Sequence, residues 1–237
     1  MIDFHSHILP GIDDGAQDIK QSITILEEAK NAGFSKIILT PHYIEQYYEY
    51  DENKRKQLVK ELEQYTKEVK LYLGNEIYIT NNIAELIKDK KASSISGTKY
   101  VLFEFPLTEI KPLNDKEVIY RLIENGYVPI IAHPERYPFI QKNPDYLFEL
   151  SDMGALFQAN FGSIIEMYGS KSKKTLKTLL KNDLISFFGT DTHRPGHVYP
   201  KMPQILRKLK KLLSDEDLER LTNINPQKVL DNEDIEY

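Results

Sequence analysis

The feature that most constrains the fold is a regular alternation of short apolar runs with longer segments of helical periodicity. The apolar runs have the length and composition of β-strands, and the segments between them place apolar residues every three or four positions. This alternation predicts parallel βα units, in which each helix returns the chain to the start of the next strand. The first predicted strand begins at Ile2, and the others span 36–40, 69–73, 100–103, 127–132, 155–159 and 184–189.

Seven strands in about 190 residues favour a closed, TIM-like α/β barrel of the (β/α)7 kind, although a doubly wound sheet shows the same alternation. No repeat, low-complexity tract or linker interrupts the 237 residues, so we expect one domain over 1–237. The predicted helices cover 17–32, a stretch from Asn53 towards 68, 83–90, 116–125, 143–153, 171–182, 203–213 and 215–221.

Composition removes several classes of function. The chain has no cysteine, which excludes disulfides, thiolate zinc sites and cysteine nucleophiles. Its net charge of −5 argues against a nucleic-acid partner, because such proteins normally carry a basic footprint. We find neither a targeting peptide nor an apolar run long enough to span a bilayer, so we expect a cytoplasmic protein that is not integral to the membrane. The oligomeric state is left open.

Side chains able to bind metal ions follow the ends of the predicted strands. Five of the six histidines occur at or just beyond the carboxyl end of a strand, where barrel enzymes carry their active sites; His197 is the nearby exception. His5 and His7 also share one side of their strand, because residues i and i+2 point the same way. The full set is His5, His7, His42, Glu76, Glu104, His133, Asp191 and His193.

This mixture of imidazoles and carboxylates suits Mn²⁺, Fe²⁺ or Zn²⁺, and eight ligands are too many for one ion. Two or three clustered ions are therefore predicted, unless these are unrelated surface residues. Clustered ions indicate hydrolysis, since a metal-bridged hydroxide is nucleophilic at neutral pH and the cations stabilise charge on a phosphoryl group. Arg136 and Arg194 follow His133 and His193 closely and could grip phosphate oxygens, or form ordinary loop salt bridges.

Six short motifs, with the ending Asn225–Leu230, resemble a known family over almost the entire chain. They are similar to those of the polymerase and histidinol phosphatase (PHP) superfamily, and more narrowly to the manganese-dependent protein-tyrosine phosphatases of Gram-positive capsule and exopolysaccharide operons. The motifs are His5-Ser6-His7, Thr40-Pro41-His42, Gly74-Asn75-Glu76, Phe103-Glu104-Phe105, Ala132-His133-Pro134-Glu135-Arg136 and Gly189-Thr190-Asp191-Thr192-His193.

The resemblance implies a distorted (β/α)7 barrel that holds three divalent ions, expected to be Mn²⁺, with Fe, Mg or Zn as alternatives. By motif, His5, His7, Glu76 and Asp191 would hold the first ion, and Glu76 would bridge to a second ion held by Glu104 and His133. Asp14, His42 and His193 would hold the third. Asp13 competes with Asp14 for this role, because the two are adjacent and only the turn geometry decides between them.

Two positions separate the chain from the histidinol-phosphatase branch, where the family resemblance leads us to expect histidines. Asp14 and Glu104 stand there instead, and extra carboxylates favour Mn²⁺ or Mg²⁺ over Zn²⁺. The resemblance thus implies a protein-tyrosine phosphatase that acts on the autophosphorylated tail of a bacterial tyrosine kinase and so regulates capsule synthesis. The alternatives are a small-molecule phosphatase, such as histidinol-phosphate phosphatase, and a metal-stabilised binding module without catalysis.

Two further features have no assigned role. The tyrosine-rich stretch 43–50 either lines the mouth of the site or covers the flank of a helix. The basic segments 171–174 and 207–211 either dock an acidic partner or are solvated helix faces.

Overall fold

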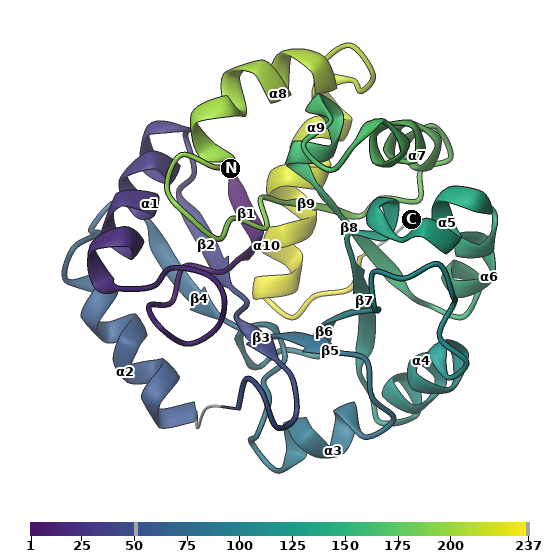
Figure 1. Ribbon diagram of the computed structural model, residues 1–237, viewed down its shortest axis with the longest axis horizontal. Helices are drawn as coiled ribbons and strands as arrows, with labels where there is room; N and C mark the ends of the chain where they lie inside the picture. The colour runs from purple at the N-terminus through teal and green to yellow at the C-terminus, as the bar shows by residue number, and fades with distance from the viewer. Residues whose placement is uncertain (50–51, 236–237) are drawn as a thin grey trace.

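A computed structural model describes residues 1–49 and 52–235, and within them parallel strands form a barrel surrounded by helices (Figure 1). The strands pair in two sheets, in the order β1-β2-β4 and β3-β5-β6-β7-β8-β9. Their bounds are β1 (Ile2–Ser6), β2 (Lys36–Leu39), β3 (His42–Tyr43), β4 (Lys70–Leu73), β5 (Glu76–Tyr78), β6 (Tyr100–Glu104), β7 (Val128–Ala132), β8 (Leu156–Asn160) and β9 (Phe187–Gly189).

The two sheets are continuous with each other. The chain passes from β2 into β3 through Thr40 and Pro41, and from β4 into β5 through Gly74 and Asn75. β2 pairs with β4, and β3 pairs with β5. The segments β2 and β3 are therefore one bent strand, β4 and β5 are its neighbour, and both bend at the same level of the barrel. The nine described segments therefore make the seven predicted strands, each at its predicted place.

The barrel closes between its first and last strands. Ser6 pairs with Thr192 in a parallel bridge. The Asp191 amide donates to the His5 carbonyl at 2.8 Å, and the His7 amide donates to the Thr192 carbonyl at 3.0 Å. The prediction of a closed (β/α)7 barrel is confirmed, and the doubly wound alternative is wrong.

The helices pack outside the barrel with their apolar faces inward. In α1, for example, Asp18 caps the first turn by accepting from the Gln21 amide, and Ile25, Leu26 and Ala29 are buried. The helices are α1 (Ile19–Asn31), α2 (Glu52–Glu63), α3 (Ile83–Lys88), α4 (Asp115–Glu124), α5 (Pro138–Lys142), α6 (Tyr146–Asp152), α7 (Ser170–Lys181), α8 (Met202–Leu209), α9 (Asp215–Glu219) and α10 (Asn225–Leu230).

Short turns of helix join these elements. η1 (Ile95–Gly97), η2 (Pro134–Arg136), η3 (Phe161–Ile165) and η4 (Tyr199–Lys201) are 3₁₀ turns, and η5 (Arg220–Ile224) is a π-helical turn. The predicted helices are all present, but α5 and α10 were not predicted. No helix in residues 1–49 and 52–235 is long and apolar enough to cross a membrane.

The barrel interior changes character along its axis. Alternate residues of each strand face inward, and near the strand starts they form an apolar cluster that includes Phe4, Leu102, Leu156 and Phe187. Val229 of α10 belongs to the same cluster and closes the amino end. Towards the carboxyl ends the inward residues become polar, so a chemical site inside the barrel would lie at that end.

Candidate metal centre

A bulge in β1 aims His5 into the barrel. The register between β1 and β2 shifts between Asp3 and Ser6, so that Phe4 joins the interior apolar cluster and the next residue, His5, is also buried at the polar end. Bulges commonly re-aim side chains in this way. His5 fits because residue 189 is glycine: a Cβ there would lie 2.5 Å from the Cβ of His5.

Glu76 is the centre of the cluster. Its Oε2 lies 3.2 Å from Nε2 of both His5 and His7 and 3.1 Å from Nδ1 of His42. Its Oε1 lies 2.8 Å from Nε2 of His133. One fully buried carboxylate thus contacts four imidazoles from three strand ends, since His5 and His7 both lie at the end of β1.

Glu104 completes this side of the cluster. Its two oxygens lie 3.2 Å from His42 Nδ1 and 3.8 Å from His133 Nε2.

His133 itself has a φ of 34°, and Asp191 a φ of 51°, in the left-handed region that residues other than glycine seldom occupy. Such conformations occur at functional sites, where the surrounding structure holds them against their cost.

The turn after β1 separates Asp13 from Asp14. Asp13 faces inward: its Oδ2 accepts from His7 Nδ1 at 2.8 Å and from the His42 amide at 2.9 Å, while its Oδ1 accepts from the Gly15 amide. Asp14 is 55% exposed, with Oδ1 at 3.5 Å from His42 Nε2 and 3.4 Å from His193 Nε2. Asp14 therefore has the geometry of a ligand, and Asp13 that of a carboxylate that orients a ligand.

Asp191 joins the cluster through one oxygen and is held through the other. Its Oδ1 lies between 3.5 and 3.7 Å from His5, His7 and His193. Its Oδ2 accepts from Arg136 Nη1 at 2.5 Å and from Asn160 Nδ2 at 2.7 Å. The Arg136 guanidinium also lies 4.4 Å from the ring of Tyr168.

Two residues of β8 hold this arrangement and were not predicted from the sequence. His5 Nδ1 lies 2.7 Å from Gln158 Oε1, Gln158 donates to Asn160 Oδ1, and Asn160 donates to Asp191. The chain of hydrogen bonds fixes the first and last members of the cluster together. Their one signal in the sequence is that both are polar and lie on the same side of the strand as the apolar Leu156, which faces inward.

The electrostatics of the cluster match a site for cations. Burial alone would lower the pKa of His5, but the Glu76 and Asp191 carboxylates raise it to about 9. Burial likewise opposes protonation of His42, and Glu76 and Glu104 raise its pKa to about 10. Burial would raise the pKa of Asp191, yet His5 and Arg136 hold it well below its ordinary value. Positive charge is thus strongly favoured at this point.

Several buried polar atoms of the cluster residues make no hydrogen bond within the described part of the chain. They are Glu76 Oε2, His42 Nδ1 and His133 Nδ1. Buried polar atoms are normally satisfied. Three sets of ligand atoms, each within 4.8 Å of one another, are His7, Asp14, His42 and His193; His5, His7 and Glu76; and His42, Glu76 and Glu104. The imidazole and carboxylate donors fit divalent ions such as Mn²⁺.

The structure brings together all nine predicted ligands and Arg136, but not Arg194. The Arg194 side chain is exposed, and within residues 1–49 and 52–235 its guanidinium forms no ion pair. His197, the histidine excluded from the prediction, lies outside the three ligand sets; His133 and Asp191 also lie outside them but contact Glu76 and His5. Arg194 as a phosphate-binding residue stays a prediction.

The tyrosine-rich stretch has a divided role. Tyr43 is buried in the outer core, Tyr47 is exposed, and Tyr48 stacks on the His42 ring with 6.0 Å between centroids. Tyr50 lies outside the described residues. One of the tyrosines, Tyr48, therefore borders the cluster, as expected if the stretch lines the mouth of the site.

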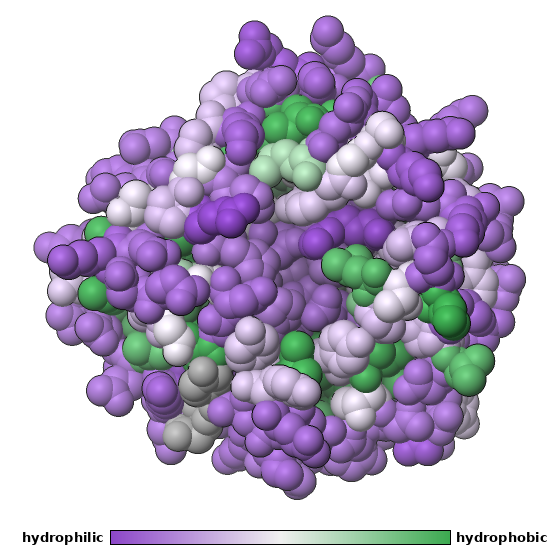
Figure 2. Space-filling model, viewed as in Figure 1, coloured by the Kyte–Doolittle hydropathy of each residue, from purple (hydrophilic) through white to green (hydrophobic). Residues whose placement is uncertain are grey.

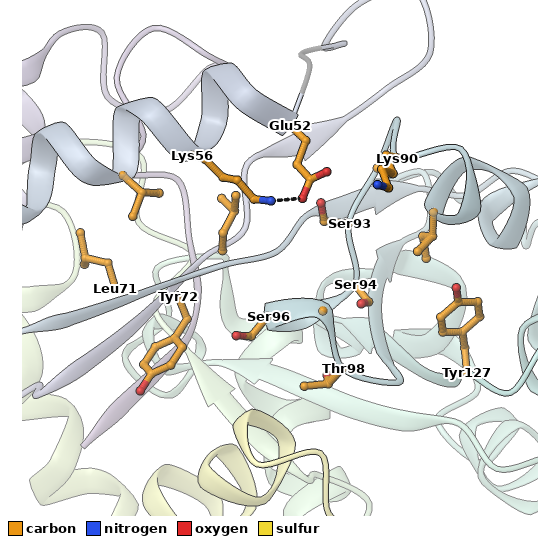
Figure 3. A pocket seen from close by; sticks show the side chains of 15 residues that line it. Glu52, Lys56, Leu71, Tyr72, Lys90, Ser93, Ser94, Ser96, Thr98 and Tyr127 are labelled. Atoms are coloured by element: carbon orange, nitrogen blue, oxygen red, sulfur yellow. Dashed lines mark ion pairs between the residues drawn. The ribbon is translucent and has the colours of Figure 1, made fainter.

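The face in view in Figures 1 and 2 has a hydrophilic hollow near its middle, with hydrophobic groups below and to the right. A separate pocket of 570 Å³ lies on the barrel flank, between α2, β4 and residues 87–98, with the Glu52–Lys56 ion pair at its edge (Figure 3). None of the cluster residues lines that pocket. The metal-ligand geometry, not the size of the cavity, identifies the site.

Sequence comparison finds relatives that cover most of the chain. A family model described as capsular polysaccharide synthesis, CpsB/CapC, matches residues 1–231. A putative tyrosine-protein phosphatase CapC of Staphylococcus aureus is 36% identical, covering 99% of this chain and 93% of its own. The tyrosine-protein phosphatase YwqE of Bacillus subtilis is 34% identical over 81% of this chain and 77% of its own.

Structure comparison agrees. A crystal structure from work on YwqE of B. subtilis and CpsB of Streptococcus pneumoniae, metal-dependent tyrosine phosphatases, matches with a TM-score of 0.90 at 32% identity, covering 100% of this chain and 96% of that one. Histidinol phosphate phosphatase of Lactococcus lactis matches with a TM-score of 0.59 at 15% identity, over 89% and 93% of the two chains. That second likeness shows a common fold.

Proposed function

Because the chain belongs to the CpsB/CapC family of capsular polysaccharide synthesis proteins, we propose that it is a metal-dependent protein-tyrosine phosphatase whose substrate is the phosphorylated tail of a bacterial tyrosine kinase. The proposal includes a cytoplasmic location and a single catalytic domain over 1–237. The observation that carries it is the convergence on Glu76 of four imidazoles from three strand ends.

The proposed ligand sets follow the contacts in the cluster. His5, His7, Glu76 and Asp191 would hold one ion; Glu76, Glu104 and His133 a second; and Asp14, His42 and His193 a third. His42 supports a compact cluster, because its Nδ1 faces Glu76 and Glu104 while its Nε2 faces Asp14. When bound, divalent ions would supply Lewis acidity both to the phosphoryl oxygens and to the attacking water.

The protein's own residues bind and orient the substrate. Arg136 lies at the edge of the cluster with its guanidinium fixed by Asp191 and by the Tyr168 ring, so its fork is preorganised for two phosphoryl oxygens. Preorganised donors gain strength as charge develops in the transition state. We assign Arg136 to this role, and Arg194 to a second, outer contact with phosphate.

The test compares substrates on the same protein loaded with Mn²⁺. Rates of phosphate release are measured on a phosphotyrosyl peptide, on the matched phosphoseryl peptide and on histidinol phosphate, each with and without a chelator. We expect chelation to stop all turnover, and phosphotyrosine to react fastest because its longer aromatic arm reaches a recessed cluster. Equal rates on the two peptides, or faster reaction of histidinol phosphate, would contradict the proposed substrate class.

A further inference from the structure

The β6–α4 loop, residues 105–114, carries apolar side chains that have no cover. Leu107 is 49% exposed, Ile110 76% and Leu113 99%, and Leu113 is the most exposed large apolar side chain in the described part of the chain. Single exposed apolar residues are ordinary, but three within seven positions of one loop make an apolar strip. We call Leu107, Ile110 and Leu113 the rim strip.

The loop is held in this orientation by its polar residues. Lys111 turns towards the protein, where its Nζ donates to the Tyr146 hydroxyl at 3.0 Å and lies 4.4 Å from the centre of that ring. Glu109 pairs with Lys142, and Asn114 donates to Asn81 at 2.6 Å. The charged groups thus contact the protein while the apolar groups face solvent. A surface loop without a partner favours the opposite arrangement, with its apolar groups packed on the protein.

The strip begins beside the metal cluster. Glu104, a cluster residue, lies three positions before Leu107, and the intervening Phe105 is buried with its amide bonded to the Tyr137 hydroxyl at 2.9 Å. An extended chain spans at most about 3.6 Å per residue, so Leu107 lies within roughly 11 Å of Glu104 and Ile110 within roughly 22 Å along the loop. In Figure 2 hydrophobic groups border the hydrophilic hollow on one side.

We propose that the rim strip binds apolar side chains of the substrate polypeptide that lie within about six residues of the phosphotyrosine. This rests on the proposed function and deepens it by stating which substrates are preferred. The loop leads directly away from Glu104, so a polypeptide with its phosphotyrosine at the cluster can extend its flanking residues along it. The strip supplies apolar contact area there without touching the phosphoryl group.

A second copy of the chain is a less suitable occupant. Stable protein interfaces use about 20 to 30 residues on each side, whereas the strip offers three side chains on one loop. A short peptide segment matches three spaced contacts of this kind, since a few apolar anchors carry most of the affinity in such complexes. The strip therefore fits a single extended chain.

The experiment uses the full chain with Mn²⁺ and two phosphotyrosyl peptides that differ only in having Leu or Ser four residues to either side of the phosphotyrosine. In wild type we expect kcat/KM for the Leu peptide to exceed that for the Ser peptide about tenfold, mainly through KM. The Ile110→Ser/Leu113→Ser variant should lose this preference. Its turnover of para-nitrophenyl phosphate, which has no flanking chain, should remain that of wild type.

Ile224→Ser is the matched control, because Ile224 is 45% exposed on η5, near the amino end of the barrel. It should keep the preference. A wild type that does not distinguish the peptides, or a double variant that still does, would overturn the proposal even with full para-nitrophenyl phosphate turnover. If para-nitrophenyl phosphate is not hydrolysed at all, the proposed function fails instead.

Binding provides a readout that does not depend on turnover. With chelator present, fluorescence anisotropy of the labelled Leu peptide should show the same loss of affinity in the double variant, and unchanged affinity there would also overturn the proposal. Light scattering during size-exclusion chromatography gives the remaining outcome. If the double substitution converts an oligomer to a monomer, the strip is an interface between copies, and the proposal is wrong.

Discussion

The two ends of the barrel interior are built on the same strands from opposite kinds of side chain. Near the amino end, Leu102 and Leu156 face inward with the stacked rings of Phe4 and Phe187. Two residues further along β6 and β8, the next inward-facing residues are Glu104 and Gln158. Apolar burial stabilises the first layer, whereas desolvated charge makes the second layer costly unless cations occupy it. Stability and chemistry are therefore separated along the barrel axis.

The largest expected effect is on stability, at the apolar end. Phe187 is fully buried with its ring 4.1 Å from that of Phe4, so Phe187→Ala should lower the free energy of unfolding by about 3 to 5 kcal/mol. Denaturant unfolding of wild type and variant measures this. Phe148→Ala, at a 41% exposed position on α6, should cost far less. Equal losses at the two positions would remove the distinction between this interior layer and the surface.

Most of the barrel could be predicted because its signals are local. Apolar runs and helical periodicity placed all seven strands and the helices longer than seven residues. The helices that were missed, α5 and α10, have five and six residues, although α9 and α3 are equally short and were predicted. The bends at Pro41 and Asn75 were not predicted either, because they depend on pairing between strands that are distant in sequence.

The candidate site divides in the same way. Its ligands were predictable because they follow strand ends, but the choice between Asp13 and Asp14 needed the turn that points one inward and the other towards His193. Gln158, Asn160 and Tyr168 act through contacts with other parts of the chain. Gln158 and Asn160 are marked in the sequence only by their polarity at inward-facing positions of β8, and Tyr168 has no such signal.

At the polar end, the largest effect on turnover outside the ligands should come from Arg136. Arg136→Ala should lower kcat by roughly 10²- to 10³-fold, and Arg136→Lys by less, since lysine keeps the charge but loses the planar fork. Bound Mn²⁺ should stay unchanged because Arg136 is not a proposed ligand. Arg194→Ala, at an exposed position, is the matched comparison and should lower kcat by only a fewfold. An unaltered kcat in Arg136→Ala would leave this arginine as a structural partner of Asp191.

A smaller effect is expected from the carboxylate behind His7. Burial alone would raise the pKa of Asp13, but His7 lowers it to about 2, and the pair fixes the orientation of the His7 ring. Asp13→Asn should weaken Mn²⁺ binding about 10- to 100-fold, with turnover recovering at high Mn²⁺ concentration. Titration of metal-free protein with Mn²⁺ measures this. Asp18→Asn, which preserves a good helix cap, should leave affinity unchanged; equal losses in both variants would argue against the orienting role.

The separation of stability from chemistry is tested most directly by removing the metal from wild-type protein. Bound metal, turnover of a phosphotyrosyl peptide and thermal unfolding are measured on the same samples before chelation, after it, and after Mn²⁺ is restored. Turnover should fall with bound metal and return with it, while the metal-free barrel keeps its far-UV circular dichroism and unfolds cooperatively at a somewhat lower temperature, because a ligand of the native state has been lost. Turnover that persists without bound metal, or a chain that unfolds as soon as the metal leaves, would contradict this account.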